Sequence, residues 1–153
     1  MNNSTNYHYR DTALDRTLTG DSERTHAMKL NHLDLQVQDV TRTKAFFERY
    51  FGLHVQSNPS SPALVILTDE AGFVLVLQRS QTPQPYPEGF HLGFLLDDVA
   101  SVQALHARAL ADGAQVSDVI VNGRGTMIYL TAPEGYYVEV SCQRHRFAPA
   151  SAA

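Results

Sequence analysis

His32, His91 and Glu139 are the residues of this sequence whose types best suit metal chemistry. Two imidazole nitrogens and one carboxylate on one face of a divalent ion leave other coordination positions open for a ligand. Open positions are typical of catalytic metal sites, whereas structural sites are closed by protein ligands. A single histidine or glutamate in a strand is more often a hydrogen-bonded or solvated residue, so these three are singled out by a further feature, an internal repeat.

The segment that contains His32 is repeated in the segment that contains His91. NHLDLQVQDVTRTKAFFERYFGLHV aligns with FHLGFLLDDVASVQALHARALADGAQV at an offset of 59 positions. GFVLVLQ from Gly72 aligns with GYYVEVS from Gly135 at an offset of 63 positions, so the second copy has four additional residues. Self-similarity at a fixed offset predicts two copies of one structural unit.

Each unit reads as a strand, a helix and three further strands. In the first unit we expect strands at 30–37, 55–57, 63–68 and 73–79, and a helix over 41–51 that Gly52 ends. In the second unit we expect strands at 90–96, 115–121, 126–131 and 136–142, and a helix over 99–111 that ends before Gly113. The linker 80–89 contains three prolines, which predict a stiff, extended connection between the units.

Strand alternation places the three candidate ligands on the faces that point away from the helices. His32 lies on the polar face of its strand, and His91 lies on the face opposite to that of Leu92, which faces the helix. Glu139 alternates with the core residue Val138, and Tyr137 and Ser141 share its face. Because the three ligands occupy equivalent or nearly equivalent places in the two units, pairing the units is expected to bring them together.

Length, composition and charge restrict the class of protein. The chain has 153 residues, a formal net charge of -4 and one cysteine, Cys142. This balance argues against a broad nucleic-acid or membrane footprint, a disulfide framework and a spanning helix. We expect a cytoplasmic protein with a polar N-terminal extension at 1–27, a folded domain at 28–145 with modules at about 29–80 and 89–143, and a C-terminal tail at 146–153.

The segments LNHLDLQVQDVTRTKAFFERYFGL, FHLGFLLDDV and TAPEGYYVEVSC resemble the vicinal oxygen chelate superfamily. This superfamily includes glyoxalase I, fosfomycin thiol transferases, extradiol ring-cleavage dioxygenases and bleomycin-resistance proteins. The resemblance covers residues 29–143 and implies an α+β fold in which two βαβββ modules, with curved mixed sheets, form a cup for a divalent metal such as Fe, Mn, Ni, Co or Zn. His32, His91 and Glu139 match the metal-ligand positions. The resemblance also implies a homodimer, with the cup formed within one chain or across two by module exchange.

This sequence differs from each branch of the superfamily at particular positions. Val76 stands where glyoxalase I has a fourth ligand, and Gln36 and Ser80 stand at its glutathione-binding positions, so glyoxalase I activity is not expected. Fosfomycin transferases share the ligand triad but have Thr where this chain has Asp34, and segment 121–127 lacks the serines of their potassium loop. Extradiol dioxygenases have further histidines where this chain has Val76 and Ile120, and bleomycin-resistance proteins lack the metal ligands altogether.

The expected function is therefore that of a metal-dependent enzyme of the dioxygenase, thiol-transferase or lyase/isomerase type, acting on a small oxygen-bearing substrate. The alternative is a metal-free binding or antibiotic-sequestration protein. Tyr129 and Asp34 are candidate proton-handling residues, because a phenol or carboxyl beside a metal-bound oxygen can transfer a proton. Residues expected to line the substrate pocket are Gln36, Val76, Leu95, Met127 and Arg124, the last in an Asn-Gly-Arg-Gly loop near the mouth of the cup.

Overall fold

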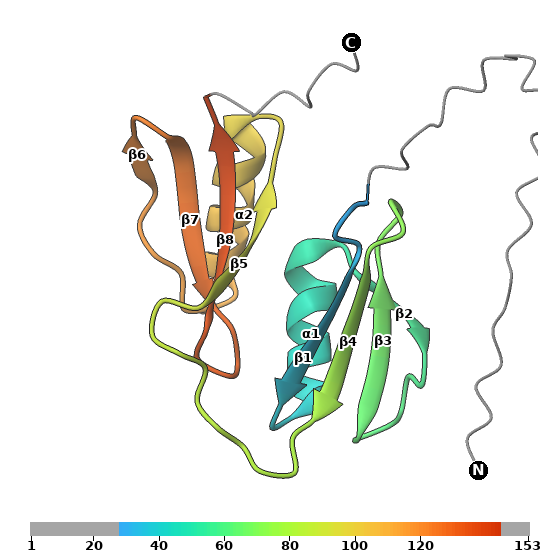
Figure 1. The fold of residues 1–153 in the computed structure, drawn as a ribbon. Coiled ribbons are helices and arrows are strands. Elements are labelled where there is room, and N and C mark those ends of the chain that lie inside the picture. The colour runs from blue at the N-terminus through green and yellow to red at the C-terminus, as the bar shows by residue number, and fades with distance from the viewer. Residues whose placement is uncertain (1–27, 145–153) are drawn as a thin grey trace, which may run out of the picture.

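A computed structural model describes residues 28–144 as two modules that lie side by side and are joined by the linker 80–89 (Figure 1). The predicted extension at 1–27 and the predicted tail at 146–153 lie outside the described residues. Each module is a four-stranded mixed sheet with one helix, so the predicted α+β fold with two βαβββ units is confirmed.

The two modules have the same topology. The first contains β1 (His32–Val37), α1 (Val40–Phe51), β2 (His54–Ser57), β3 (Leu64–Thr68) and β4 (Val74–Arg79), in the sheet order β1-β4-β3-β2. The second contains β5 (His91–Leu95), α2 (Val99–Ala111), β6 (Ile120–Asn122), β7 (Gly125–Thr131) and β8 (Tyr137–Gln143), in the order β5-β8-β7-β6. In both, the first strand pairs in parallel with the last, and the other pairings are antiparallel.

Equivalent residues begin the two helices. The side chain of Asp39 accepts a hydrogen bond from the backbone N–H of Arg42, and Asp98 does the same for Ser101. Such capping satisfies backbone donors that have no partner inside the helix. Gly52 ends α1 in the left-handed conformation at φ 67°, as the sequence predicts. Neither helix within residues 28–144 has the length and apolar character that a membrane-spanning helix needs.

The predicted strand 115–121 is wrong as a single element. Val116 forms only an isolated bridge with Leu130, and β6 begins at Ile120. Between them the Oγ of Ser117 accepts a hydrogen bond from the N–H of Tyr129 at 3.0 Å. A side-chain oxygen thus takes the place of the strand carbonyl that would continue the ladder, because serine competes for backbone donors.

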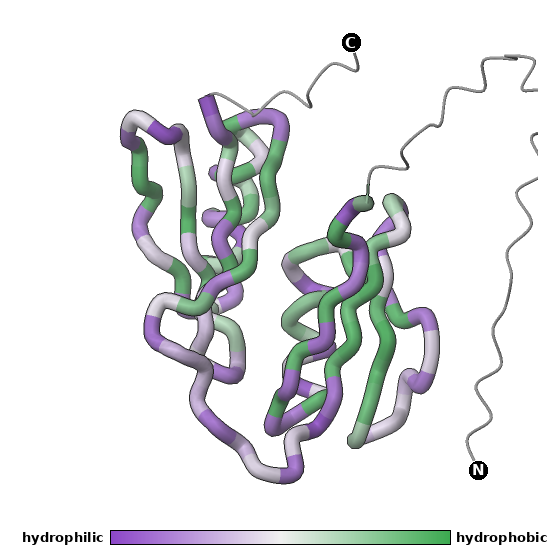
Figure 2. Tube along the Cα trace, viewed as in Figure 1, coloured by the Kyte–Doolittle hydropathy of each residue, from purple (hydrophilic) through white to green (hydrophobic). Residues whose placement is uncertain are grey.

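Each helix covers one face of its own sheet: α1 packs on β3 and β4, and α2 packs on β7 and β8. Burial confirms the predicted alternation, since Leu35 and Val37 are buried whereas His32 and Asp34 are exposed. In Figure 2, β3 and β4 are hydrophobic over most of their length and the linker is hydrophilic or neutral. The opposite face of each sheet is left without a helix.

The end of α1 joins the two modules on the helix side. The ring of Phe51 stacks on Phe94 of β5, with centroids 4.7 Å apart. Arg49 holds Asp112 through two hydrogen bonds of 2.9 and 2.8 Å, and the hydroxyl of Tyr50 donates to the same carboxylate at 3.1 Å. One stacked aromatic pair and one charged hydrogen-bond network thus join the two modules behind the sheets.

Replacing Tyr136 by phenylalanine is expected to raise the free energy of unfolding at neutral pH by about 1 kcal/mol. The Tyr136 hydroxyl is buried and has no hydrogen-bond partner within the described structure, so its desolvation is uncompensated. Burial raises the pKa of Tyr136 above its ordinary value, so the folded state keeps the proton after the unfolded chain has lost it. Above about pH 10 the wild type should therefore lose up to about 1.4 kcal/mol per pH unit more than the variant.

Urea unfolding at pH 7 and pH 11 measures both effects for Tyr136→Phe. Tyr137→Phe is the matched control, because Tyr137 is 48% exposed and should change stability little. A Tyr136→Phe variant that is less stable than the wild type at pH 7 would show that the hydroxyl has a stabilising partner.

Candidate metal centre

Parallel pairing of β5 with β8 brings His91 and Glu139 together. In this register His91 lies opposite Tyr137, and Gly93 lies opposite Glu139. Because Gly93 has no side chain, the space beside Glu139 is open. His91 and Glu139 both lie on the sheet face that no helix covers. His91 Nε2 and Glu139 Oε2 are 4.0 Å apart.

The imidazole of His91 is held in one orientation. Its Nδ1 lies 2.9 Å from the carbonyl oxygen of Gly89, which can only accept, so Nδ1 carries the proton and donates it. The lone pair is then on Nε2, the nitrogen that faces Glu139. A backbone carbonyl on the second ring nitrogen is the usual support of a metal-binding histidine.

Glu139 is the buried acid of this face, with 5% of its surface exposed. The hydroxyl of Tyr129 donates to Glu139 Oε2 at 2.9 Å, and the guanidinium of Arg124 lies 3.9 Å from Oε1. Burial, and then the hydrogen bond to Glu139, raise the pKa of Tyr129 above its ordinary value. Tyr129 is therefore a neutral hydrogen-bond donor at physiological pH.

Arg124 reaches Glu139 from the turn between β6 and β7. Asn122 pairs with Gly125 across the turn, and the Asn122 side chain accepts from the Arg124 N–H at 2.8 Å. The carbonyl of Arg124 accepts a hydrogen bond from the backbone N–H of Arg144 at 3.1 Å. The predicted loop is thus an ordered two-residue hairpin turn, anchored on both sides.

The residues predicted on β1 form a separate group on the first sheet. His32 is exposed, and the amide of Gln36 donates to the Asp34 carboxylate at 3.1 Å. Asp34 lies opposite the buried Val76 in the register of β1 with β4. Within residues 28–144 no three His, Cys, Asp or Glu side chains are grouped so that they could hold one ion. Within one chain, His91 and Glu139 therefore lie together on the second sheet, and His32 lies apart from them on the first.

The remaining predicted pocket residues lie in one row on the second sheet. Leu95, Ser141 and Met127 are cross-strand neighbours on β5, β8 and β7. Leu95 is 48% exposed, whereas Met127 and Ser141 are buried. The exposed Leu95 on the edge strand β5 and Tyr137 on the neighbouring β8 make this part of the face apolar.

The contact of Arg124 with Glu139 was not predicted, because Arg124 was expected only to line the substrate pocket. The signal was present in Asn122 and Gly125, whose types favour a tight hairpin that would return Arg124 to the last strand. Tyr137 was placed on the correct face by alternation but was not considered as part of the site.

Comparison with known protein families matches residues 29–140 to the Glyoxalase/Bleomycin resistance protein/Dioxygenase superfamily. Among solved structures, a possible glyoxalase from Bacillus cereus is 34% identical in sequence. The alignment covers 76% of this chain and 100% of that chain, with a TM-score of 0.68.

Two more distant structures share the fold. A genomically encoded fosfomycin resistance protein, FosX, from Listeria monocytogenes is 21% identical, with coverage of 76% and 93% and a TM-score of 0.63. A bleomycin resistance determinant encoded on the transposon Tn5 is 20% identical, with coverage of 77% and 100% and a TM-score of 0.59. No curated protein matches the chain.

Proposed function

Because the chain belongs to the Glyoxalase/Bleomycin resistance protein/Dioxygenase superfamily, we propose that it is a divalent-metal-dependent enzyme acting on a small substrate held through two neighbouring oxygens. His32, His91 and Glu139 would hold the ion, which is Fe, Mn, Ni, Co or Zn. The reaction is of the dioxygenase, thiol-transferase or lyase/isomerase type. Glyoxalase I has a fourth metal ligand where this chain has Val76, which argues against glyoxalase I activity.

The single observation that carries this proposal is the preorganised pair His91 and Glu139. The Nε2 lone pair faces a buried carboxylate, and the other ring nitrogen is anchored on Gly89. Two ligands that each lie about 2.1 Å from one ion are about 3 Å from each other. The observed 4.0 Å is wider than this, so the Glu139 carboxylate would move toward Nε2 when an ion binds, while Gly89 keeps the imidazole in place. The donor set therefore fits a divalent ion.

We place the complete centre between two copies of the chain. His32 lies on a different sheet from the other two ligands, and both sheets leave the ligand-bearing face without a helix. A two-fold arrangement that sets the first sheet of one copy against the second sheet of its partner would give two equivalent centres. The exposed Leu95 and Tyr137 would be covered in such a dimer.

The bound ion would act as a Lewis acid toward the substrate oxygens. Tyr129 holds a proton at its phenol oxygen beside Glu139 and can supply it to a neighbouring oxygen. Arg124 places a guanidinium at the edge of the same site, where an anionic group of the substrate would find a partner. Asp34 on the facing sheet is the second candidate for proton transfer.

Elemental mass spectrometry of the purified, untagged protein tests this proposal. We expect about one ion per chain, retained in His54→Ala and lost in Glu139→Gln, because a neutral amide is a poor ligand for a divalent ion. His54 is the control because it is an exposed histidine on β2, the far edge of the first sheet. No uptake after incubation with each of the five metals would contradict the proposal.

The second candidate function is metal-free binding of a small molecule in the same cup. The observation that favours it is the contact of Arg124 with Glu139, since a guanidinium at 3.9 Å already balances the buried charge. If the protein takes up no metal and remains dimeric, this candidate becomes the leading one.

A further inference from the structure

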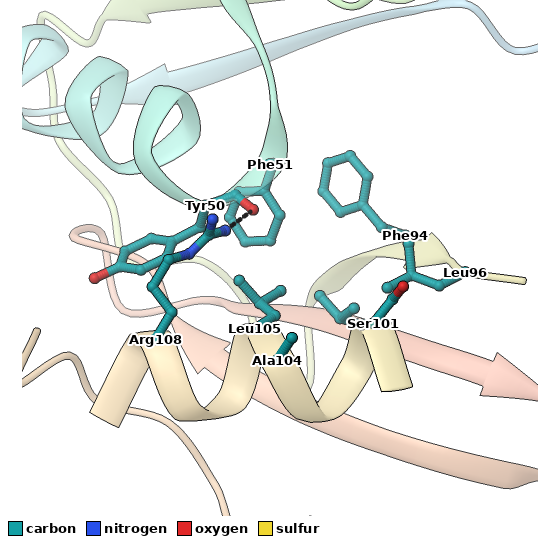
Figure 3. A pocket seen from close by; sticks show the side chains of 9 residues that line it. Tyr50, Phe51, Phe94, Leu96, Ser101, Ala104, Leu105 and Arg108 are labelled. Atoms are coloured by element: carbon teal, nitrogen blue, oxygen red, sulfur yellow. Dashed lines mark hydrogen bonds between the residues drawn. The ribbon is translucent and has the colours of Figure 1, made fainter. Parts of the chain in front are cut away.

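A hollow of about 370 Å³ lies on the helix side of the second module, away from the candidate metal centre. Its floor is formed by Ala104 and Leu105 of α2, and its walls include Phe94 of β5 and Phe51 of α1 (Figure 3). Ser101 and Arg108 stand near its two ends. Small-molecule sites are usually apolar concavities of about 300–1,000 Å³ with a few polar groups.

The internal repeat shows how the residues at this place differ between the two modules. The aromatic residues Phe46 and Tyr50 of α1 correspond to the smaller Leu105 and Ala109 of α2 at the offset of 59 positions. In the first module the equivalent strand residue Leu35 is buried, whereas its counterpart Phe94 is only partly buried. The face of α2 that forms the floor of the hollow therefore carries smaller side chains than the corresponding face of α1, whose Tyr50 lines the hollow from the first module.

Arg108 makes one end of the hollow positively charged. Its Nη2 donates to the carbonyl of Tyr50 at 3.1 Å, and its guanidinium carbon lies 5.8 Å from the centre of the Tyr50 ring. The nearby Asp112 is already bound by Arg49 through two hydrogen bonds. The Arg108 guanidinium is thus held near Asp112, whose charge it partly balances, while its hydrogen bond goes to the Tyr50 carbonyl.

At the opposite end of the hollow, Ser101 is hydrogen-bonded to a carboxylate that lies outside the lining. Asp98 accepts hydrogen bonds from the N–H and the hydroxyl of Ser101 at 2.7 and 2.9 Å. Ser101 and Arg108 are seven positions apart on α2, which corresponds to about 10 Å along the helix. A ligand with one anionic group would therefore be oriented with that group toward Arg108.

We propose that this hollow is a second binding site, for a small aromatic monocarboxylate whose ring lies between Phe94 and Leu105 and whose carboxylate binds Arg108. A planar guanidinium pairs with a carboxylate through two parallel hydrogen bonds, which favours a carboxylate over a neutral polar group. The site is independent of the metal, because none of its residues belongs to the candidate metal centre.

Isothermal titration of the full-length protein with 4-phenylbutyrate, in the presence of EDTA, tests the site. EDTA removes any ion that could bind the carboxylate at the other centre. We expect saturable binding with one ligand per chain, about tenfold weaker in Arg108→Gln and unchanged in Lys29→Gln. The uncharged 4-phenylbutanol should bind about as weakly as 4-phenylbutyrate binds to Arg108→Gln.

A second variant tests the apolar part of the hollow. Ala104→Phe should abolish binding by filling the space, and its thermal unfolding shows whether the fold is retained. Equal affinity in the wild type, Arg108→Gln and a folded Ala104→Phe would overturn the proposal. So would the absence of saturable binding, or binding that changes with protein concentration, which would indicate that a second copy covers the hollow.

Discussion

A mixture of the His32→Ala and Glu139→Ala variants is expected to bind metal although neither variant binds it alone. If the ligands come from two chains, a mixed dimer has one centre that lacks both ligands and one centre that is intact. Random reassociation would make about half of the dimers mixed, so the mixture should hold about a quarter of an ion per chain. Each variant by itself should lose at least about 100-fold in metal affinity, because one of three protein ligands is absent.

The measurement is elemental analysis after the two variants have been unfolded together, refolded and separated from free metal. A mixture of His91→Ala with Glu139→Ala is the control, because both substitutions affect the same half of the centre. We expect no recovery in that mixture. Equal recovery in the two mixtures, or none in either while the wild type binds metal, would contradict a centre shared between chains.

Gly125→Ala is expected to lower the free energy of unfolding by about 2–4 kcal/mol. The backbone of Gly125 has φ 145°, a conformation that residues with a side chain rarely adopt. A Cβ there would lie 2.2 Å from the carbonyl oxygen of Cys142 and 3.0 Å from the Cα of Gln143. Because these are backbone atoms of the paired strand, β7 and β8 would have to separate locally.

Gly123→Ala provides the control within the same turn. Gly123 is not among the glycines with positive φ, and a Cβ there would meet nothing within 4 Å. Chemical unfolding should therefore show a change of no more than about 0.5 kcal/mol for Gly123→Ala. Comparable losses in the two variants would mean that the turn tolerates no side chain at either position, rather than that β8 excludes one.

Local signals in the sequence were sufficient to predict most of the fold. Asp39 and Asp98 mark the helix starts in both repeats, and the helix predicted over 99–111 has the bounds that the structure shows. The segment 115–121 could not be resolved in the same way. Its apolar residues suit a strand, and only the position of Ser117 relative to Tyr129 determines where the ladder stops.

The candidate site was predictable only within each module. Strand alternation is a local property, and it placed His91 and Glu139 on one face of β5 and β8. The distance of His32 from that pair depends on how two sheets with no shared ladder are arranged, which no local pattern encodes. The approach of Arg124 to Glu139 likewise depends on the geometry of a turn and not on its composition alone.

The separation of His32 from His91 and Glu139 on different sheets has a consequence for how the protein responds to its own abundance. If a complete centre needs two chains, then while dimers are scarce the number of complete centres rises with the square of the free chain concentration, and their fraction rises in proportion to it. Dilution would then remove the activity without unfolding either module. The fraction of complete centres would then depend on the protein concentration as well as on the fold.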